Sequence, residues 1–142
     1  MRILILNGPN LNVLGTREPH IYGSTSFDAF LPELRNAFPQ ATIELRQSNI
    51  EGELVEALQQ APQHFDAVVL NAAGYSHTSV ALRDTVATMS IPVVEVHISN
   101  IHAREEFRHN SLTGSVSKGV ISGLGLDGYR LAIDHLLRAG RK

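Results

Sequence analysis

Short apolar runs alternate along the chain with longer segments in which apolar residues recur every three or four positions. The runs are strand-sized and almost wholly apolar, which is typical of strands buried on both faces of a parallel sheet. The longer segments have the period of amphipathic helices. The pattern predicts strands at 3–6, 41–45, 66–70, 92–96 and 119–122, helices at 27–38, 78–89 and 126–137, and a helical turn at 104–107.

Local signals mark where two helices begin. Ser26 is a plausible N-cap for the first predicted helix. Ser48 and Glu51 have the spacing of a capping box, which predicts a further helix that opens there and runs to about Gln60. Pro32 falls inside the first predicted helix, so that helix either kinks at the proline or starts later.

Alternating strands and helices in 142 residues predict one α/β domain spanning 1–142. Five parallel strands in so short a chain favour a flavodoxin-like, doubly wound sheet of order 2-1-3-4-5 in a three-layer fold. Ligands of such sheets bind beyond the carboxyl ends of the strands. Polar residues that follow the first, third and fourth strands should therefore meet at one rim.

The connection after the first strand, 7–23, is long and polar, and such a connection in a compact domain is usually functional. It carries Arg17 and Tyr22. A phenol is largely un-ionised at neutral pH, but a nearby cation favours its anion, which can act as a base. Taken alone, however, an Arg17–Glu18 surface pair with Tyr22 anchoring the loop is the stronger interpretation.

The fourth predicted strand places Glu95, His97 and Ser99 on one face. A carboxylate beside a histidine orients the ring and favours its protonated form, which suits general acid–base catalysis. A structural Glu–His pair is an equally good interpretation of this segment. A metal site built on His97 and His102 lacks a third ligand.

Two other motifs have both a functional and a structural interpretation. The segment 123–128 matches G-x-G-x-x-G, but only 14 residues follow it, so glycines that allow a tight turn and close helix packing are favoured over dinucleotide binding. The segment 74–78 resembles a nucleophile elbow around Ser76 without its final glycine. A serine hydrolase is the resulting alternative; helix caps at Ser76, Thr78 and Ser79 are the structural interpretation.

Composition narrows the possible chemistry. Apolar residues make up 43% and charged residues 18% of the chain, and the net charge is −2, which fits a soluble protein and gives no basic surface for nucleic acid. No apolar stretch could span a membrane, and the N-terminal one is too short for a signal peptide, so we expect a cytoplasmic protein. There is no cysteine, and Lys118 and Lys142 are the only lysines, which leaves one weak candidate for Schiff-base chemistry.

Five blocks of sequence, in order and with characteristic spacing, resemble the type II 3-dehydroquinate dehydratases. They begin with Asn7-Gly8-Pro9-Asn10-Leu11, followed by Leu14-Gly15-Thr16-Arg17-Glu18-Pro19 and Tyr22-Gly23. The other four blocks are 46–52, 71–84, 95–100 and 102–108, and the resemblance runs from Arg2 to about Leu137.

The resemblance implies loss of water from 3-dehydroquinate to give 3-dehydroshikimate in the shikimate pathway, without a metal or cofactor. Tyr22 would take the proton, activated by Arg17. Asn10 would help to stabilise the resulting enolate, and His97, supported by Glu95, would protonate the leaving hydroxyl.

The resemblance also implies a set of binding groups and an assembly. Asn71 and the backbone N–H groups of Ile98 and Ser99 would hold the substrate carboxylate. His77 and Arg108 would hold ring hydroxyls, and Asp84 would complete the site, with a neighbouring subunit as one possible source. Members of this family look like trimers assembled into dodecamers, and the loop around Tyr22 would act as a lid.

One further alternative is a non-enzymatic flavodoxin-like binding module, such as a phosphoacceptor receiver. That function needs acidic residues at the ends of the first and third strands, where this chain has Asn7 and Asn71. The scarcity of lysine is independent support for the type II reaction, because the other dehydratase type for this substrate works through a lysine imine.

Overall fold

The computed structural model describes residues 1–16 and 18–141. The strands are β1 (Arg2–Asn7), β2 (Thr42–Gln47), β3 (Ala67–Asn71), β4 (Val93–His97) and β5 (Gly119–Ser122). The α-helices are α1 (Pro19–Tyr22), α2 (Phe27–Ala37), α3 (Glu51–His64), α4 (Val80–Ala87) and α5 (Asp127–Ala139). Short 3₁₀ turns are η1 (Leu11–Val13), η2 (Ala73–His77), η3 (Ile101–Ala103), η4 (Glu106–Arg108) and η5 (Gly114–Val116). Within the described residues, no helix is long and apolar enough to cross a membrane.

The strands form one parallel sheet in the order β2-β1-β3-β4-β5, which confirms the predicted flavodoxin-like topology. β1 lies at the switch point: its last residue, Asn7, pairs with Gln47 on one side and Asn71 on the other. Every residue of β3 and β4 is buried. The continuous apolar character of these strands therefore follows from their central position.

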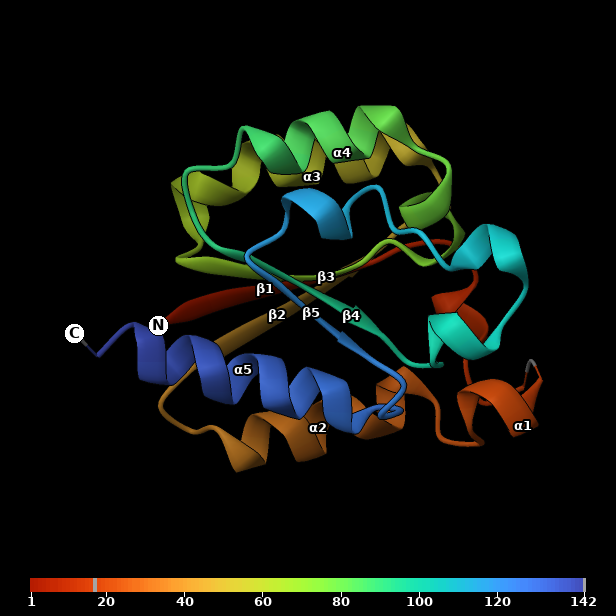
Figure 1. Ribbon diagram of the computed structural model, residues 1–142. Coiled ribbons are helices and arrows are strands. Elements are labelled where there is room, and N and C mark those ends of the chain that lie inside the picture. Colours follow the sequence, from red (N-terminus) through yellow and green to blue (C-terminus); the bar gives the residue numbers. More distant parts are fainter. Residues whose placement is uncertain (17, 142) are drawn as a thin grey trace.

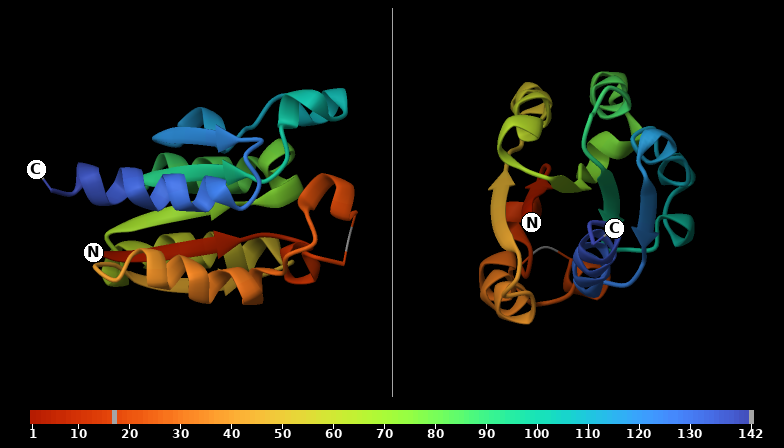
Figure 2. Two further views of the ribbon diagram at one scale, coloured as in Figure 1. Left: turned by 90° about the horizontal axis from the view of Figure 1, so that it is seen from below. Right: turned by 90° about the vertical axis from the view of Figure 1, so that its left-hand side faces the viewer.

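Helices cover both faces of the sheet and make three layers (Figure 1). α2 and α5 cover one face, where Phe27, Phe30 and Tyr129 pack edge to face around the core. α3 and α4 cover the other, with Leu54 and Leu82 among the fully buried side chains. Figure 2 shows the same arrangement from below and from the end. The short helices and turns gather at the carboxyl ends of the strands.

The predicted capping box is wrong. Ile50, not Ser48, occupies the N-cap of α3, and no side chain caps that helix. Ser48 instead makes a tight turn before it: its hydroxyl accepts from the Ile50 N–H at 2.9 Å and donates to Glu53 at 2.7 Å. The helix also continues past Gln60. By contrast, Ser26 does cap α2, by accepting from the Ala29 N–H.

Several other boundaries differ from the predicted ones. α2 starts at Phe27 and contains Pro32, so the alternative of a later start is wrong. The predicted helix at 78–89 shortens to α4, because residues 73–77 form η2 before Ser79 caps the helix. The single turn predicted at 104–107 is replaced by η3 and η4 on either side of Arg104. The long N-terminal connection contains η1 and α1.

The G-x-G-x-x-G motif serves packing, as predicted. Gly123 has a φ of +92°, a conformation that strongly favours glycine. A Cβ added at Gly128 would lie 3.0 Å from Cγ1 of Val96, so glycine lets α5 approach the sheet closely.

Candidate active site

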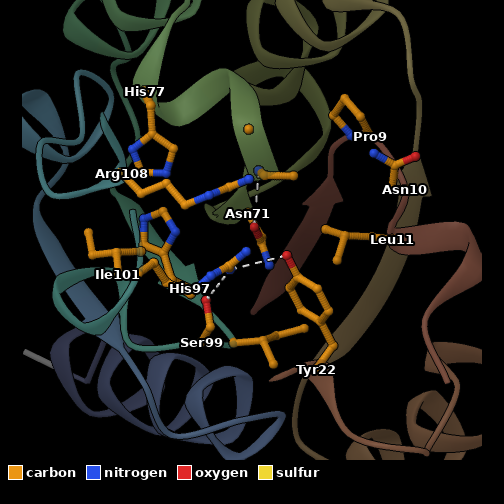
Figure 3. Close-up of a pocket in the computed structure, with 14 residues that line it drawn as sticks. Pro9, Asn10, Leu11, Tyr22, Asn71, His77, His97, Ser99, Ile101 and Arg108 are labelled. Atoms are coloured by element: carbon orange, nitrogen blue, oxygen red, sulfur yellow. Dashed lines mark hydrogen bonds between the residues drawn. The ribbon is translucent and has the colours of Figure 1, made fainter. Parts of the chain in front are cut away.

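The carboxyl ends of β1, β3 and β4 open onto one pocket, as the topology predicts (Figure 3). The pocket has a volume of about 590 Å³, including the part open to solvent. It brings together most of the residues that the sequence nominated. Those in its lining are Asn10, Tyr22, Asn71, His77, His97, Ile98, Ser99 and Arg108.

Glu95 and His97 form a buried pair at the end of β4. The His97 Nε2 lies 2.7 Å from Oε2 of Glu95, and their side chains are 5% and 0% exposed. Burial pushes the pKa of the Glu95 carboxyl upward, but the hydrogen bond and charge of His97, with hydrogen bonds from Ser111 and Thr113, outweigh it and leave that pKa below its ordinary value. With Nε2 committed to the carboxylate, Nδ1 is the ring nitrogen that remains for a ligand.

The ring of His77 stacks on that of His97, with centroids 5.9 Å apart. Because a carbonyl can only accept, the contact of 2.9 Å between His77 Nδ1 and the Asn110 oxygen requires a proton on Nδ1. Burial lowers the pKa of His77, and although the Asn110 bond raises it, the charges of His97 and Arg108 add to the lowering. His77 is therefore a neutral ring whose Nε2 can accept a hydrogen bond.

Tyr22 reaches the pocket from α1 and contacts an arginine from another part of the chain. Arg104 donates to the Tyr22 hydroxyl at 3.1 Å and to Oγ of Ser99 at 3.0 Å. Its guanidinium carbon lies 5.4 Å from the centroid of the Tyr22 ring, and its side chain is only 12% exposed. The Tyr22 hydroxyl is therefore held beside a positive charge within the pocket. Arg17, the predicted activator, lies outside the described residues.

Asn10, which follows β1, and Asn71, the last residue of β3, line the pocket at the switch point. Asn10 adopts a left-handed conformation, with φ of 70°, and its N–H donates to Oδ1 of Asn49 at 3.0 Å. Asn71 donates to the hydroxyl of Tyr129 at 2.9 Å, and that hydroxyl donates to Asn7 at 2.8 Å. Burial raises the pKa of Tyr129, so this clamp between strand ends is a neutral phenol.

Two nominated residues in the described part of the chain do not line this pocket: Glu95, which contacts His97 instead, and Asp84. Asp84 lies on α4 with a side chain that is 62% exposed, and it pairs with Arg83 at 3.0 Å. Within one chain it therefore forms an ion pair on the surface of the helix. Arg108, by contrast, extends into the pocket and is held by Glu105 at 2.7 Å.

The serine hydrolase alternative is wrong on geometry. Ser76 is fully buried in η2 and does not line the pocket. Among the described residues its hydroxyl has no hydrogen-bond partner, whereas a nucleophilic serine needs a base within reach. Ser79 performs the capping role that the sequence indicated, since its hydroxyl accepts from the Leu82 N–H.

Sequence reasoning missed the residues that support the site from behind. Ser111 and Thr113 donate to Glu95, and Asn110 holds His77. His109, for which the sequence indicated no partner, donates from Nε2 to the carbonyl of Arg104 at 2.9 Å. These residues lie in the segment 109–113, which has no hydrophobic periodicity. Its polar side chains, directly after Arg108, were the one sign in the sequence that it could belong to the site. Residues 1–16 and 18–141 contain no group of three potential metal ligands.

Fold and site together define an α/β protein of flavodoxin-like architecture whose pocket at the switch point is lined by a tyrosine, two histidines and two arginines. A family model described as Dehydroquinase class II matches residues 1–137. The chain is 52% identical to a 3-dehydroquinate dehydratase of Aeromonas salmonicida, over 97% of this chain and 96% of that one. It is 50% identical to one of Bacillus licheniformis, over 99% and 98%. The crystal structure of a type II dehydroquinase from Butyrivibrio crossotus superposes with a TM-score of 0.93 at 44% identity, over 96% of this chain and 97% of that one.

The chain belongs to the class II dehydroquinase family and is an enzyme of the hydro-lyase class. The alternative of a non-enzymatic binding module is therefore wrong.

Proposed function

We propose that this pocket eliminates water from 3-dehydroquinate to give 3-dehydroshikimate, through an enolate, with Tyr22 as the base and His97 as the acid. One observation carries the proposal: a single pocket holds both a phenol bonded to an arginine and an imidazole bonded to a buried carboxylate. The names of the relatives supply the substrate, and the family belongs to the shikimate pathway.

The first step removes a proton from the carbon beside the substrate carbonyl. The Tyr22 phenolate takes this proton, and the electron pair of the broken C–H bond moves onto the carbonyl oxygen. The guanidinium of Arg104 supports the phenolate before the transfer. In this proposal Arg17 is a second activating cation, and Asn10, which lines the pocket, stabilises the enolate oxygen through a water.

The second step expels the hydroxyl. The enolate electrons form the new carbon–carbon double bond, the bond from carbon to the hydroxyl oxygen breaks, and that oxygen takes the proton from Nδ1 of His97. Glu95 supports the charged imidazole that this step requires. The proton gained by Tyr22 balances the proton lost by His97, so solvent exchange returns both groups to their starting forms.

Binding groups surround these two residues. Asn71 and the backbone N–H groups of Ile98 and Ser99 would hold the carboxylate, and His77 and Arg108 the ring hydroxyls. Asp84 does not line its own pocket, so its predicted part requires a neighbouring subunit of a homo-oligomer, which we expect to be a dodecamer of trimers. The segment around α1 would close as a lid and exclude water. No cofactor or metal takes part.

The test is to mix the protein with 3-dehydroquinate and follow the ultraviolet absorbance of the conjugated enone product. We expect a steady rise at micromolar protein. No rise above the background without protein would refute the proposed function.

A further inference from the structure

The segment 111–114 wraps the carboxylate of Glu95 on the side away from the pocket. Ser111 donates to Oε2 of Glu95 at 2.6 Å, and Thr113 donates to Oε1. Thr113 is fully buried. Together with Nε2 of His97, these hydroxyls give the carboxylate three donors, distributed over both of its oxygens.

The carboxylate needs these donors because of where β4 places it. Glu95 is fully buried in the sheet, where its strand neighbours are Leu70 and Val120. A buried anion in apolar surroundings is costly unless it is paired and hydrogen-bonded. His97 alone satisfies one acceptor position on one oxygen, and the two hydroxyls satisfy two more.

The proton of the Ser111 hydroxyl is directed by its own neighbour. Oγ of Ser111 accepts from the N–H of Gly114 at 3.0 Å, which turns its single proton toward Glu95. The fit is close: a Cβ added at Gly114 would lie 2.7 Å from Oε2 of Glu95. The backbone of this segment is therefore shaped around the carboxylate.

We propose that Ser111 and Thr113 are positioning residues for the dehydration, which hold Glu95 ionised and fix its plane so that His97 is kept charged with Nδ1 toward the substrate. This inference rests on the proposed function, because it assigns the acid step to His97. Two neutral donors stabilise the carboxylate without adding a competing positive charge beside the ring.

The other charged and titratable groups near this pair come from the opposite side. His77 stacks on the His97 ring from η2, and Arg104 and Arg108 line the same pocket. Each positive charge there opposes a positive charge on His97. Glu95 is the acidic group bonded directly to the ring, at 2.7 Å, so its negative charge acts against these positive charges.

The experiment compares Ser111→Ala and Thr113→Val with the parent, using kcat and KM for 3-dehydroquinate. The matched controls are Ser115→Ala, whose hydroxyl donates to the Leu112 carbonyl rather than to Glu95, and Thr113→Ser, which keeps the hydroxyl. We expect each hydroxyl deletion to lower kcat about tenfold with KM nearly unchanged, and both controls to stay near parent values. Unchanged kcat in both deletions, or an equal loss in Ser115→Ala, would overturn the proposal.

A second measurement does not depend on catalysis. The NMR signal of the Glu95 carboxyl carbon, assigned by its loss in Glu95→Gln, is titrated downward from about pH 8, past the ordinary carboxyl pKa of 4.5, to the lowest pH at which the protein stays folded. We expect its midpoint to rise in both deletion variants, and an unchanged midpoint would overturn the proposal. If the parent has no dehydratase activity but the midpoint still rises in the deletion variants, the proposed function is refuted while the role of the two hydroxyls at Glu95 stands. If Thr113→Val does not fold, Ser111→Ala, at a half-buried position, decides the result.

Discussion

Replacing Arg104 with glutamine should remove most of the activity without emptying the pocket. The change takes away the guanidinium that donates to the Tyr22 hydroxyl at 3.1 Å. Glutamine keeps an N–H donor and the first three side-chain carbons of arginine, although its side chain is shorter. The variant therefore tests the charge of Arg104 more than its volume.

The magnitude follows from the burial and the distance. At 3.1 Å and an effective dielectric constant of about 20, the full Coulomb attraction between guanidinium and phenolate is about 5 kcal/mol, before the cost of desolvation. Hydrogen bonds to charged groups contribute about 1.5–3 kcal/mol net. Because the Arg104 side chain is only 12% exposed, we take the upper part of that range, which corresponds to a loss of about 100-fold in kcat.

The assay is the initial rate of enone absorbance for four proteins: the parent, Arg104→Gln, Tyr22→Phe and the double variant. If Arg104 acts through the phenolate, the double variant should be no slower than Tyr22→Phe alone. Arg138→Gln is the control, since that arginine is 74% exposed on α5. Losses that multiply in the double variant, or an Arg104→Gln enzyme with more than half of the parent kcat, would refute the reasoning.

Three further predictions concern other parts of the site. Tyr22→Phe should lose most of kcat and keep KM, as measured by the same absorbance assay; near-normal turnover would refute the base assignment. Because the folded protein lowers the pKa of Glu95 below its ordinary value of 4.5, the stability that this carboxylate contributes is present above that value and is lost as the pH falls through the lower, folded-state pKa. The unfolding temperature of the parent should therefore fall more steeply below about pH 4.5 than that of Glu95→Gln. Parallel curves of unfolding temperature against pH for the two proteins would contradict this. Activity should survive borohydride treatment with substrate, because Lys118 is exposed and does not line the pocket; covalent trapping with loss of activity would exclude the enolate mechanism.

The sequence was sufficient for the sheet because burial on both faces leaves an unmistakable pattern. β3 is continuous in apolar residues, and the order of strands follows from their alternation with helices. The start of α3 could not be predicted in the same way. Ser48 and Glu51 have the spacing of a cap, but Ser48 is instead bonded to Ile50 and Glu53, a local competition that spacing alone does not reveal.

The candidate site was predictable where strand ends dictate it and not where loops do. Glu95 and His97 follow from strand alternation, and the structure brings them to 2.7 Å. The bond between Arg104 and Tyr22 joins residues that are far apart in sequence, so no local pattern indicated it. Ser111 and Thr113 escaped notice because hydroxyl residues in loops usually face water.

The two stacked histidines have a consequence for ligand design. His77 must carry its proton on the Asn110 side, so toward the pocket it can only accept, whereas a charged His97 toward the same pocket can only donate. Two identical side chains thus present opposite hydrogen-bonding polarity within 5.9 Å of each other. An ether oxygen of an inhibitor can accept a hydrogen bond from a charged His97. The same ether placed against His77 has no hydrogen to donate to the Nε2 of that ring, so no hydrogen bond forms. A compound of correct shape with the two groups exchanged should be rejected by polarity alone.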